Sequence, residues 1–95
     1  TFFLYFNIKL LNMDKIAKEL EKILIKQLKL VDYKLNNNDD IIKDLGADSL
    51  DMVEFNLIID EKFKLNISTE KFVTLTKINN LLSYINRNQS IKSLG

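Results

Sequence analysis

The sequence predicts an all-α fold of four helices, one of them short. Three segments place apolar residues at intervals of three and four, the period of an amphipathic helix, and no segment alternates convincingly as a strand does. Clusters of Asn, Asp and Ser separate these segments and supply turn and cap residues. The chain of 95 residues, 46% of them hydrophobic, suits a single compact domain.

The first helix is expected over residues 13–30, with Asn12 or Asp14 as its N-cap. Its apolar stripe consists of Ile16, Leu20, Ile23, Leu24 and Leu28. The next segment, VDYKLNNNDD, loses the helical period and concentrates Asn and Asp, which favour local bonds between side chain and backbone. A long loop is therefore expected here, anchored to the core by Ile41 and Ile42.

The second helix is expected over residues 49–62 and should present apolar side chains on two faces. One stripe should face the core: Met52, Phe55, Ile59 and Phe63. The other apolar residues fall among acids on a different side: Leu50, Val53 and Leu57. Two apolar faces indicate two neighbours. The second face either packs under the long loop or forms the centre of a docking surface.

The last two helices follow after a short connection. A brief third helix should begin at Ser68 or Thr69, either of which can act as its cap, and reach Val73. The final helix is expected over residues 76–87. Its apolar residues fall at helical spacing: Ile78, Leu81, Leu82 and Ile85.

Composition excludes several kinds of chemistry. The chain contains no histidine and no cysteine, so it cannot build a Ser-His-Asp triad, a disulfide, a catalytic thiol or a cysteine zinc site. We therefore expect a protein that is not an enzyme. Net charge is only +1, but six acids and no base lie between residues 44 and 61. This distribution indicates a basic protein partner and argues against a nucleic acid.

The segment KDLGADSLDMVEF, residues 43–55, places Ser49 at the expected start of the second helix. There its hydroxyl lies beside unpaired backbone N–H groups and the positive end of the helix dipole, which suits either an N-cap or an attached phosphodiester. Gly46 is the sole interior glycine, and a positive φ angle or a close backbone approach would require it.

The octapeptide DLGADSLD, residues 44–51, resembles the phosphopantetheine attachment motif of acyl carrier proteins of type II fatty acid synthesis. The similarity continues through MVEF, DEKF, LNISTEK and INNLLSYI and covers residues 13–88. It implies an antiparallel four-helix bundle of acyl-carrier type with a short third helix. It also implies three parts: an apolar N-terminal extension at 1–12, an acyl carrier domain at 13–88 and a C-terminal tail at 89–95.

This resemblance implies that a phosphopantetheinyl transferase attaches 4'-phosphopantetheine from coenzyme A to Ser49, between Asp48 and Leu50. The arm would hold acyl chains as thioesters and present them to the enzymes of type II fatty acid synthesis. The second helix would recognise those partners through Asp51, Val53, Glu54, Leu57, Asp60 and Glu61.

In such carriers the acyl chain enters between the helices. By position, the lining would be Ile41, Ile42, Met52, Ile59, Ile67, Phe72, Val73, Leu75, Leu81 and Ile85. Four residues depart from the family pattern: Phe72 replaces a small residue, Asn56 an apolar one, Ser68 a common proline, and Lys62 interrupts the acidic run. Phe72 could shorten or redirect the pocket.

Alternative functions stay open. The chain could be a mitochondrial carrier fixed in a larger assembly through a helical partner of the LYR type, or a carrier of polyketide or peptide assembly. A calcium-binding module is disfavoured because Ile41 and Met52 stand where an EF-hand needs ligands. Loose divalent binding by Asp44, Asp48 and Asp51 remains as a hypothesis.

Residues 1–12 are apolar and aromatic but too short to span a bilayer. They lack the features of a transit or signal peptide. They could be the trimmed end of an organelle precursor, an arm for a partner subunit, or sequence upstream of a start at Met13. We expect an organelle, mitochondrion or plastid, slightly more than a bacterial cytoplasm.

Overall fold

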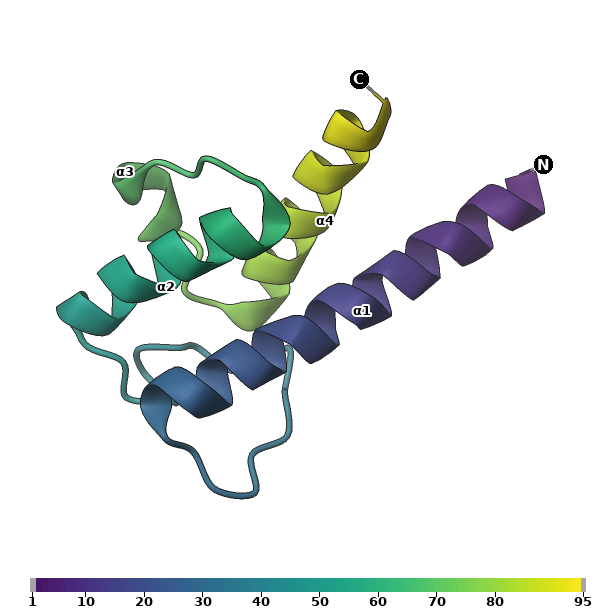
Figure 1. Cartoon of the computed structure of the whole chain (residues 1–95). Coiled ribbons are helices and arrows are strands. Elements are labelled where there is room, and N and C mark those ends of the chain that lie inside the picture. The colour runs from purple at the N-terminus through teal and green to yellow at the C-terminus, as the bar shows by residue number, and fades with distance from the viewer. Residues whose placement is uncertain (1, 95) are drawn as a thin grey trace.

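A computed structural model describes the backbone of residues 2–94 and the side chains of residues 13–89. Within that backbone it contains four helices and no strand: α1 (Phe2–Leu28), α2 (Ser49–Phe63), α3 (Thr69–Phe72) and α4 (Ile78–Leu94). α2 and α4 run opposite to α1 (Figure 1). The prediction of an all-α, antiparallel four-helix bundle with a short third helix is confirmed.

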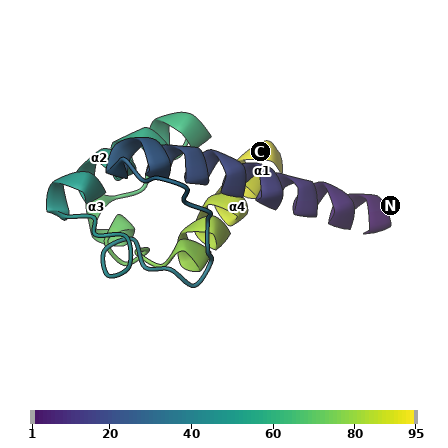
Figure 2. The same cartoon turned by 90° about the horizontal axis from the view of Figure 1, so that it is seen from below.

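The helix α1 begins at Phe2, so the predicted start at residue 13, with Asn12 or Asp14 as its cap, is wrong. No glycine or proline interrupts residues 2–28, and the helix therefore continues without a break. Its N-terminal half extends past the other helices (Figures 1 and 2). The apolar side chains of residues 1–12 lie outside the described residues.

The helix α4 also outruns its predicted end near Arg87 and continues to Leu94, through most of the predicted tail. It starts two residues later than expected because the long loop caps it. The N–H of Ile78 donates to the carbonyl of Asp39 (3.0 Å), and that of Asn79 donates to Asn37 (3.0 Å). The loop thus satisfies donors that a helix start leaves without partners.

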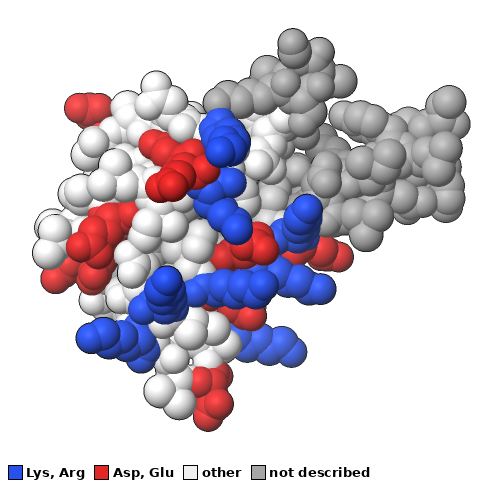
Figure 3. Space-filling model, in the orientation of Figure 1, with Lys and Arg blue, Asp and Glu red and all other residues white. Residues whose placement is uncertain are grey.

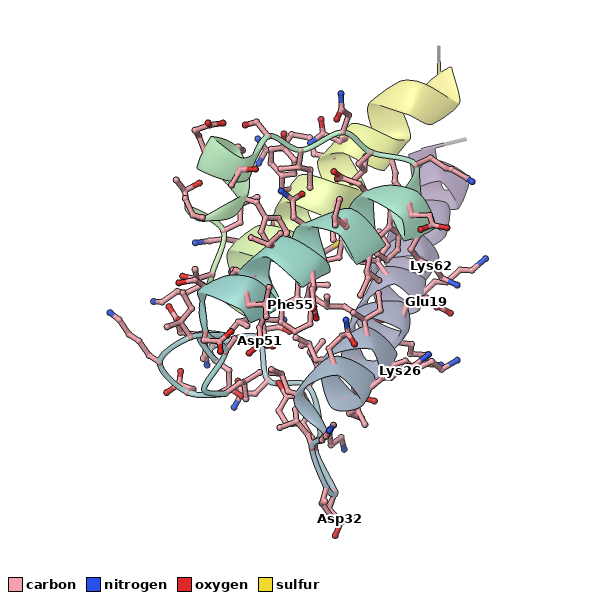
Figure 4. All side chains as sticks on the ribbon, turned by 60° about the vertical axis from the view of Figure 1, so that its left-hand side comes forward. Glu19, Lys26, Asp32, Asp51, Phe55 and Lys62 are labelled. Atoms are coloured by element: carbon pink, nitrogen blue, oxygen red, sulfur yellow. The ribbon has the colours of Figure 1, made fainter. Side chains whose placement is uncertain are left out.

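The core lies where α1 packs against α2 and α4, and α3 packs against α2. Its innermost residues, with almost no exposed surface, are Leu20, Leu24, Ile41, Phe55, Ile59, Phe72, Ile78, Leu81 and Ile85. The predicted core stripe of α2 is buried throughout. At the surface, Nζ of Lys62 lies 3.2 Å from a carboxylate oxygen of Glu19 and links α2 to α1 (Figure 4). This hydrogen bond holds the pKa of Glu19 below its ordinary value.

The second half of the long loop is fastened by Asp40, whose side chain is buried. One carboxylate oxygen accepts from the N–H of Ile42 (2.9 Å) and of Lys43 (3.0 Å), and the other accepts from the hydroxyl of Thr76 (3.0 Å). These hydrogen bonds lower the pKa of Asp40, and the bond from the N–H of Lys43 has the largest effect. The loop and the connection before α4 are therefore held together at one point.

None of the helices in the described part of the chain combines the length and apolar character needed to cross a membrane.

Candidate functional site at the start of α2

The start of α2 is closed by a reciprocal pair of aspartates. The N–H of Asp51 donates to the carboxylate of the N-cap Asp48 (2.8 Å), and the N–H of Asp48 donates to the carboxylate of Asp51 (3.0 Å). This is a capping box, and it satisfies two donors at the helix terminus. The helix start is therefore fixed without any contribution from the neighbouring serine.

Ser49 is the first residue of α2 and its side chain is exposed. The interpretation of Ser49 as the N-cap is wrong, because the cap position belongs to Asp48. Within the described part of the chain, no hydrogen bond engages the Ser49 hydroxyl. The hydroxyl is therefore open to solvent, at the end of α2 where the helix dipole favours a negative group.

The approach to Ser49 depends on Gly46. Its φ angle is +79°, and a Cβ atom added there would meet nothing within 4 Å. Positive φ, and not a close contact, is therefore the reason for glycine at this position. Just after this turn, the N–H of Ala47 donates to the carbonyl of Ile41 (3.1 Å), and Ala47 is buried. Asp48 and Ser49 follow directly from this anchored residue.

An apolar groove of about 470 Å³ opens beside Ser49, and we call it the Ser49 groove. Its volume lies in the range of about 300–1,000 Å³ that is usual for small-molecule sites. The lining comes from the loop, α2 and the α3 region: Ile42, Ala47, Asp48, Ser49, Met52, Val53, Asn56, Thr69, Phe72 and Val73. Ile42, Val53 and Val73 are about half exposed and form its open side.

The structure brings four of the ten predicted acyl-pocket residues to this groove: Ile42, Met52, Phe72 and Val73. The other six are buried but do not line it: Ile41, Ile59, Ile67, Leu75, Leu81 and Ile85. They are packed in the core cluster. Ile42 is exposed at the groove and is not the core anchor that we expected, a role that Ile41 takes alone.

Sequence reasoning missed Ala47, Asn56 and Thr69 as lining residues, and it assigned Val53 to the partner surface alone. Ala47 precedes the motif serine by two residues, so the motif itself could have indicated it. Asn56 belongs to α2 and is buried. With its amide oriented to satisfy both partners, its nitrogen donates to Asp60 (3.2 Å) and to the carbonyl of Ile67 (3.1 Å). No pattern in the sequence indicated this contact.

The outer face of α2 carries exposed apolar residues among acids. Leu50, Val53 and Leu57 are 65%, 49% and 67% exposed, so they do not pack under the long loop. Glu54 and Glu61 are exposed beside them. Figure 3 shows acids over the start of α2 and lysines along α1 on the same side of the molecule. We call Leu50, Val53, Glu54, Leu57 and Glu61 the outer face of α2.

Two acids predicted for this surface are instead engaged within the chain. Asp51 holds the capping box, and Asp60 accepts from the N–H of Ile67 (3.0 Å) and from Asn56. Both are partly buried. They contribute negative charge to the surface, but their carboxylates also hold local structure.

The acidic loop does not assemble a metal site among the side chains described. No group of three potential ligands lies close enough together to hold an ion. Asp48 and Asp51 bind each other's backbone, and a carboxylate oxygen of Asp44 accepts from the N–H of Asp40 (2.7 Å).

This arrangement fits a site that receives a group from another protein. An exposed hydroxyl at a helix N-terminus is available, and the histidine-free, cysteine-free chain offers it no imidazole base and no thiol. The adjoining apolar groove suits an apolar guest tethered at that hydroxyl, since burying apolar surface is favourable.

Comparison with known proteins agrees with this geometry. Residues 18–85 match the family model described as "Phosphopantetheine attachment site". The chain is 35% identical over 75 residues to the acyl carrier protein of Buchnera aphidicola subsp. Baizongia pistaciae (strain Bp), a match covering 79% of this chain and 96% of that protein. The matched residues include the helix start, the groove and the outer face of α2. The chain therefore belongs to the acyl carrier protein family and contains its phosphopantetheine attachment domain.

Proposed function

We propose that Ser49 carries the 4'-phosphopantetheine arm on which this carrier holds acyl chains as thioesters for fatty acid synthesis, and that the chain itself catalyses nothing. The observation that carries the proposal is the free Ser49 hydroxyl: Asp48 caps α2, and Ser49 is left exposed at the mouth of an apolar groove. The arm supplies the terminal thiol that forms the thioester, which no side chain of this cysteine-free protein can supply.

The residues around Ser49 have separate roles in this proposal. During loading, the Ser49 oxygen would form a bond to the phosphorus next to the pantetheine of coenzyme A. The pyrophosphate bond would break, adenosine 3',5'-bisphosphate would leave, and a base on the transferase would take the hydroxyl proton. The first-turn N–H groups and the dipole of α2 then favour the attached anionic phosphodiester. Asp48 and Asp51 keep the helix start in place throughout.

The outer face of α2 is the proposed recognition surface for the transferase and the synthesis enzymes. Its apolar residues Leu50, Val53 and Leu57 would be covered on docking. The acids Glu54 and Glu61 would pair with basic residues of the partner, which mainly raises the rate of encounter and sets orientation.

Intact-protein mass spectrometry after incubation with coenzyme A and a phosphopantetheinyl transferase tests the proposal. The wild-type chain should gain one phosphopantetheinyl group, and Ser49→Ala should gain none. Ser68→Ala is the matched control, because Ser68 is an exposed serine at the start of another helix, where its Oγ accepts from the N–H of Lys71. Loading of Ser49→Ala, or loss of loading in Ser68→Ala alone, would contradict the assignment.

A second candidate is a carrier fixed in a larger assembly through a helical partner of the LYR type. The continuation of α1 to Phe2, through apolar sequence and beyond the bundle, supports it, because such a segment is suited to contact with another protein (Figure 2). Co-purification of one stoichiometric partner, lost on deleting residues 1–12, is the expected result. This candidate goes with an organelle location, which fractionation of the source cells tests.

A further inference from the structure

The Ser49 groove has an open side and a closed inner wall. Ile42, Val53 and Val73 border the open side, each about half exposed. Met52 and Phe72 line the groove from within and are almost completely buried, at 4% and 1% exposure. Both also belong to the core cluster. They therefore stand between the groove and the rest of the core.

Other fully buried core residues do not line the groove. Ile59 and Leu81 are fully buried and belong to the same core cluster as Phe72. Neither is among the described side chains that line the groove. Protein cores are packed as densely as organic crystals, so an acyl chain can pass the wall only if a wall residue moves. Met52 has a flexible side chain that adapts to a guest, whereas the planar ring of Phe72 has few alternatives.

A polar group strengthens the wall. Asn56 lines the groove, and its amide nitrogen is bonded to Asp60 and to the carbonyl of Ile67. An apolar chain pushed past Asn56 would separate these partners, and buried polar groups without partners are strongly disfavoured. The deeper path is thus closed by a ring and by a bonded amide.

We infer that Phe72, supported by Asn56, sets the length of acyl chain that this carrier shelters. The inference rests on the proposed function of Ser49. A short chain lies wholly within the Ser49 groove, and carbons added beyond the wall stay in solvent. Phe72 is thus a residue that determines specificity, and it takes no part in attachment.

The test uses protein loaded at Ser49 with saturated acyl chains that lengthen by two carbons at a time. The unfolding equilibrium of each is measured by urea titration. Each sheltered methylene should raise the ratio of folded to unfolded protein by roughly a further fourfold. This increase should stop at the chain length that reaches the wall, and we call that length the plateau. In Phe72→Ala, which removes the ring from the inner wall of the groove, the plateau should move to a longer chain. Phe72→Leu, which keeps an apolar side chain and so protects folding, should move it in the same direction.

Val31→Ala is the control, because Val31 is 85% exposed and does not line the groove. Its plateau should stay at the wild-type length. A second readout is nuclear Overhauser contact between the terminal methyl of a long acyl chain and the protein. Contacts with Ile59 or Leu81 should be absent in the wild type and present in Phe72→Ala.

An identical plateau in the wild type and both Phe72 variants would overturn the inference, as would contacts with Ile59 in the wild type. Intact mass measured on the same samples separates this result from a failure of the proposed function. Normal loading with an unmoved plateau removes only the role of Phe72. Absence of loading at Ser49 removes both.

Discussion

At the scale of single residues, the aspartates of this protein divide the structural work so that one serine is left free. Asp48 and Asp51 close the start of α2, and Asp40 fastens the long loop. A charged cap is a strong acceptor for backbone N–H groups, so the serine next to it is not needed for that purpose. The free hydroxyl of Ser49 is thus a consequence of its neighbours.

Replacement of Asp40 tests the fastening of the loop. Asp40→Ala removes three hydrogen bonds to a buried carboxylate and should lower the free energy of unfolding by about 2–4 kcal/mol at neutral pH. Asp40→Asn keeps the shape and should cost less. Urea titration measures both, and a loss below about 0.5 kcal/mol for Asp40→Ala would show that the loop is held elsewhere.

The difference in the free energy of unfolding between the wild type and these variants should depend on pH. Because the folded protein lowers the pKa of Asp40, its contribution is complete above the unfolded value of about 3.9 and is lost as pH falls toward the lowered folded value. The stability difference between the wild type and Asp40→Asn should therefore shrink as pH falls below about 4. A difference that grows on acidification would contradict this sign.

At the scale of elements, α2 has one buried face and one face with exposed apolar residues among acids, and the sequence predicted both. The apolar period of α2 indicated the buried stripe of Met52 and Phe55, and the acids among Leu50 and Val53 indicated the outer face. The limits of α2 and the cap of α3 at Ser68 were also predicted, because cap residues are local signals. The start of α1 at Phe2 and the end of α4 at Leu94 were not predicted, because no local cap signal marks them.

Charge reversal on α2 tests its outer face. Glu54→Lys should slow loading by the transferase several-fold at low salt, and the difference should narrow as salt rises, because screening weakens an exposed charge. Glu54 suits this test better than Asp51, whose carboxylate also caps the helix. Initial loading rates followed by mass spectrometry provide the measurement.

Asp32→Lys is the control for charge alone. Asp32 lies at the tip of the long loop, away from Asp51 and the start of α2 (Figure 4). Asp32→Lys changes the net charge by the same amount as Glu54→Lys and should leave the loading rate close to that of the wild type. Equal rates for Glu54→Lys and the wild type at low salt would refute a steering role for α2.

The end of α1 offers a test of helix termination. Lys29 has φ +53°, and the N–H of Leu30 donates to the carbonyl of Ile25 (3.1 Å). This is the Schellman motif of a helix C-terminus, in which the residue with positive φ is usually glycine. Lys29→Gly should therefore raise the free energy of unfolding by about 0.5–1 kcal/mol. Lys18→Gly, at an exposed position inside α1, should lower it by about 1 kcal/mol. Urea titration that shows destabilisation by both changes would contradict the assigned geometry.

At the scale of the whole molecule, parts distant in sequence combine to make the site. The long loop supplies Ile42 and Ala47, and the α3 region supplies Phe72 and Val73. The loop is held in place by Asp40 and by its bonds to the start of α4. The attachment motif could be predicted from the sequence because its residues are contiguous. The groove was only partly predicted, because position in a family pattern cannot distinguish a lining side chain such as Phe72 from core neighbours such as Ile59.

In the proposed function, the Ser49 oxygen is the point at which the phosphopantetheine arm is attached. Peptide mass mapping of protein isolated from its native source tests this claim most directly. We expect one phosphopantetheinyl group, with or without an acyl chain, on the peptide that contains Ser49 and on no other peptide. A native protein in which that peptide is wholly unmodified, and which stays so with coenzyme A and an active transferase, would contradict it.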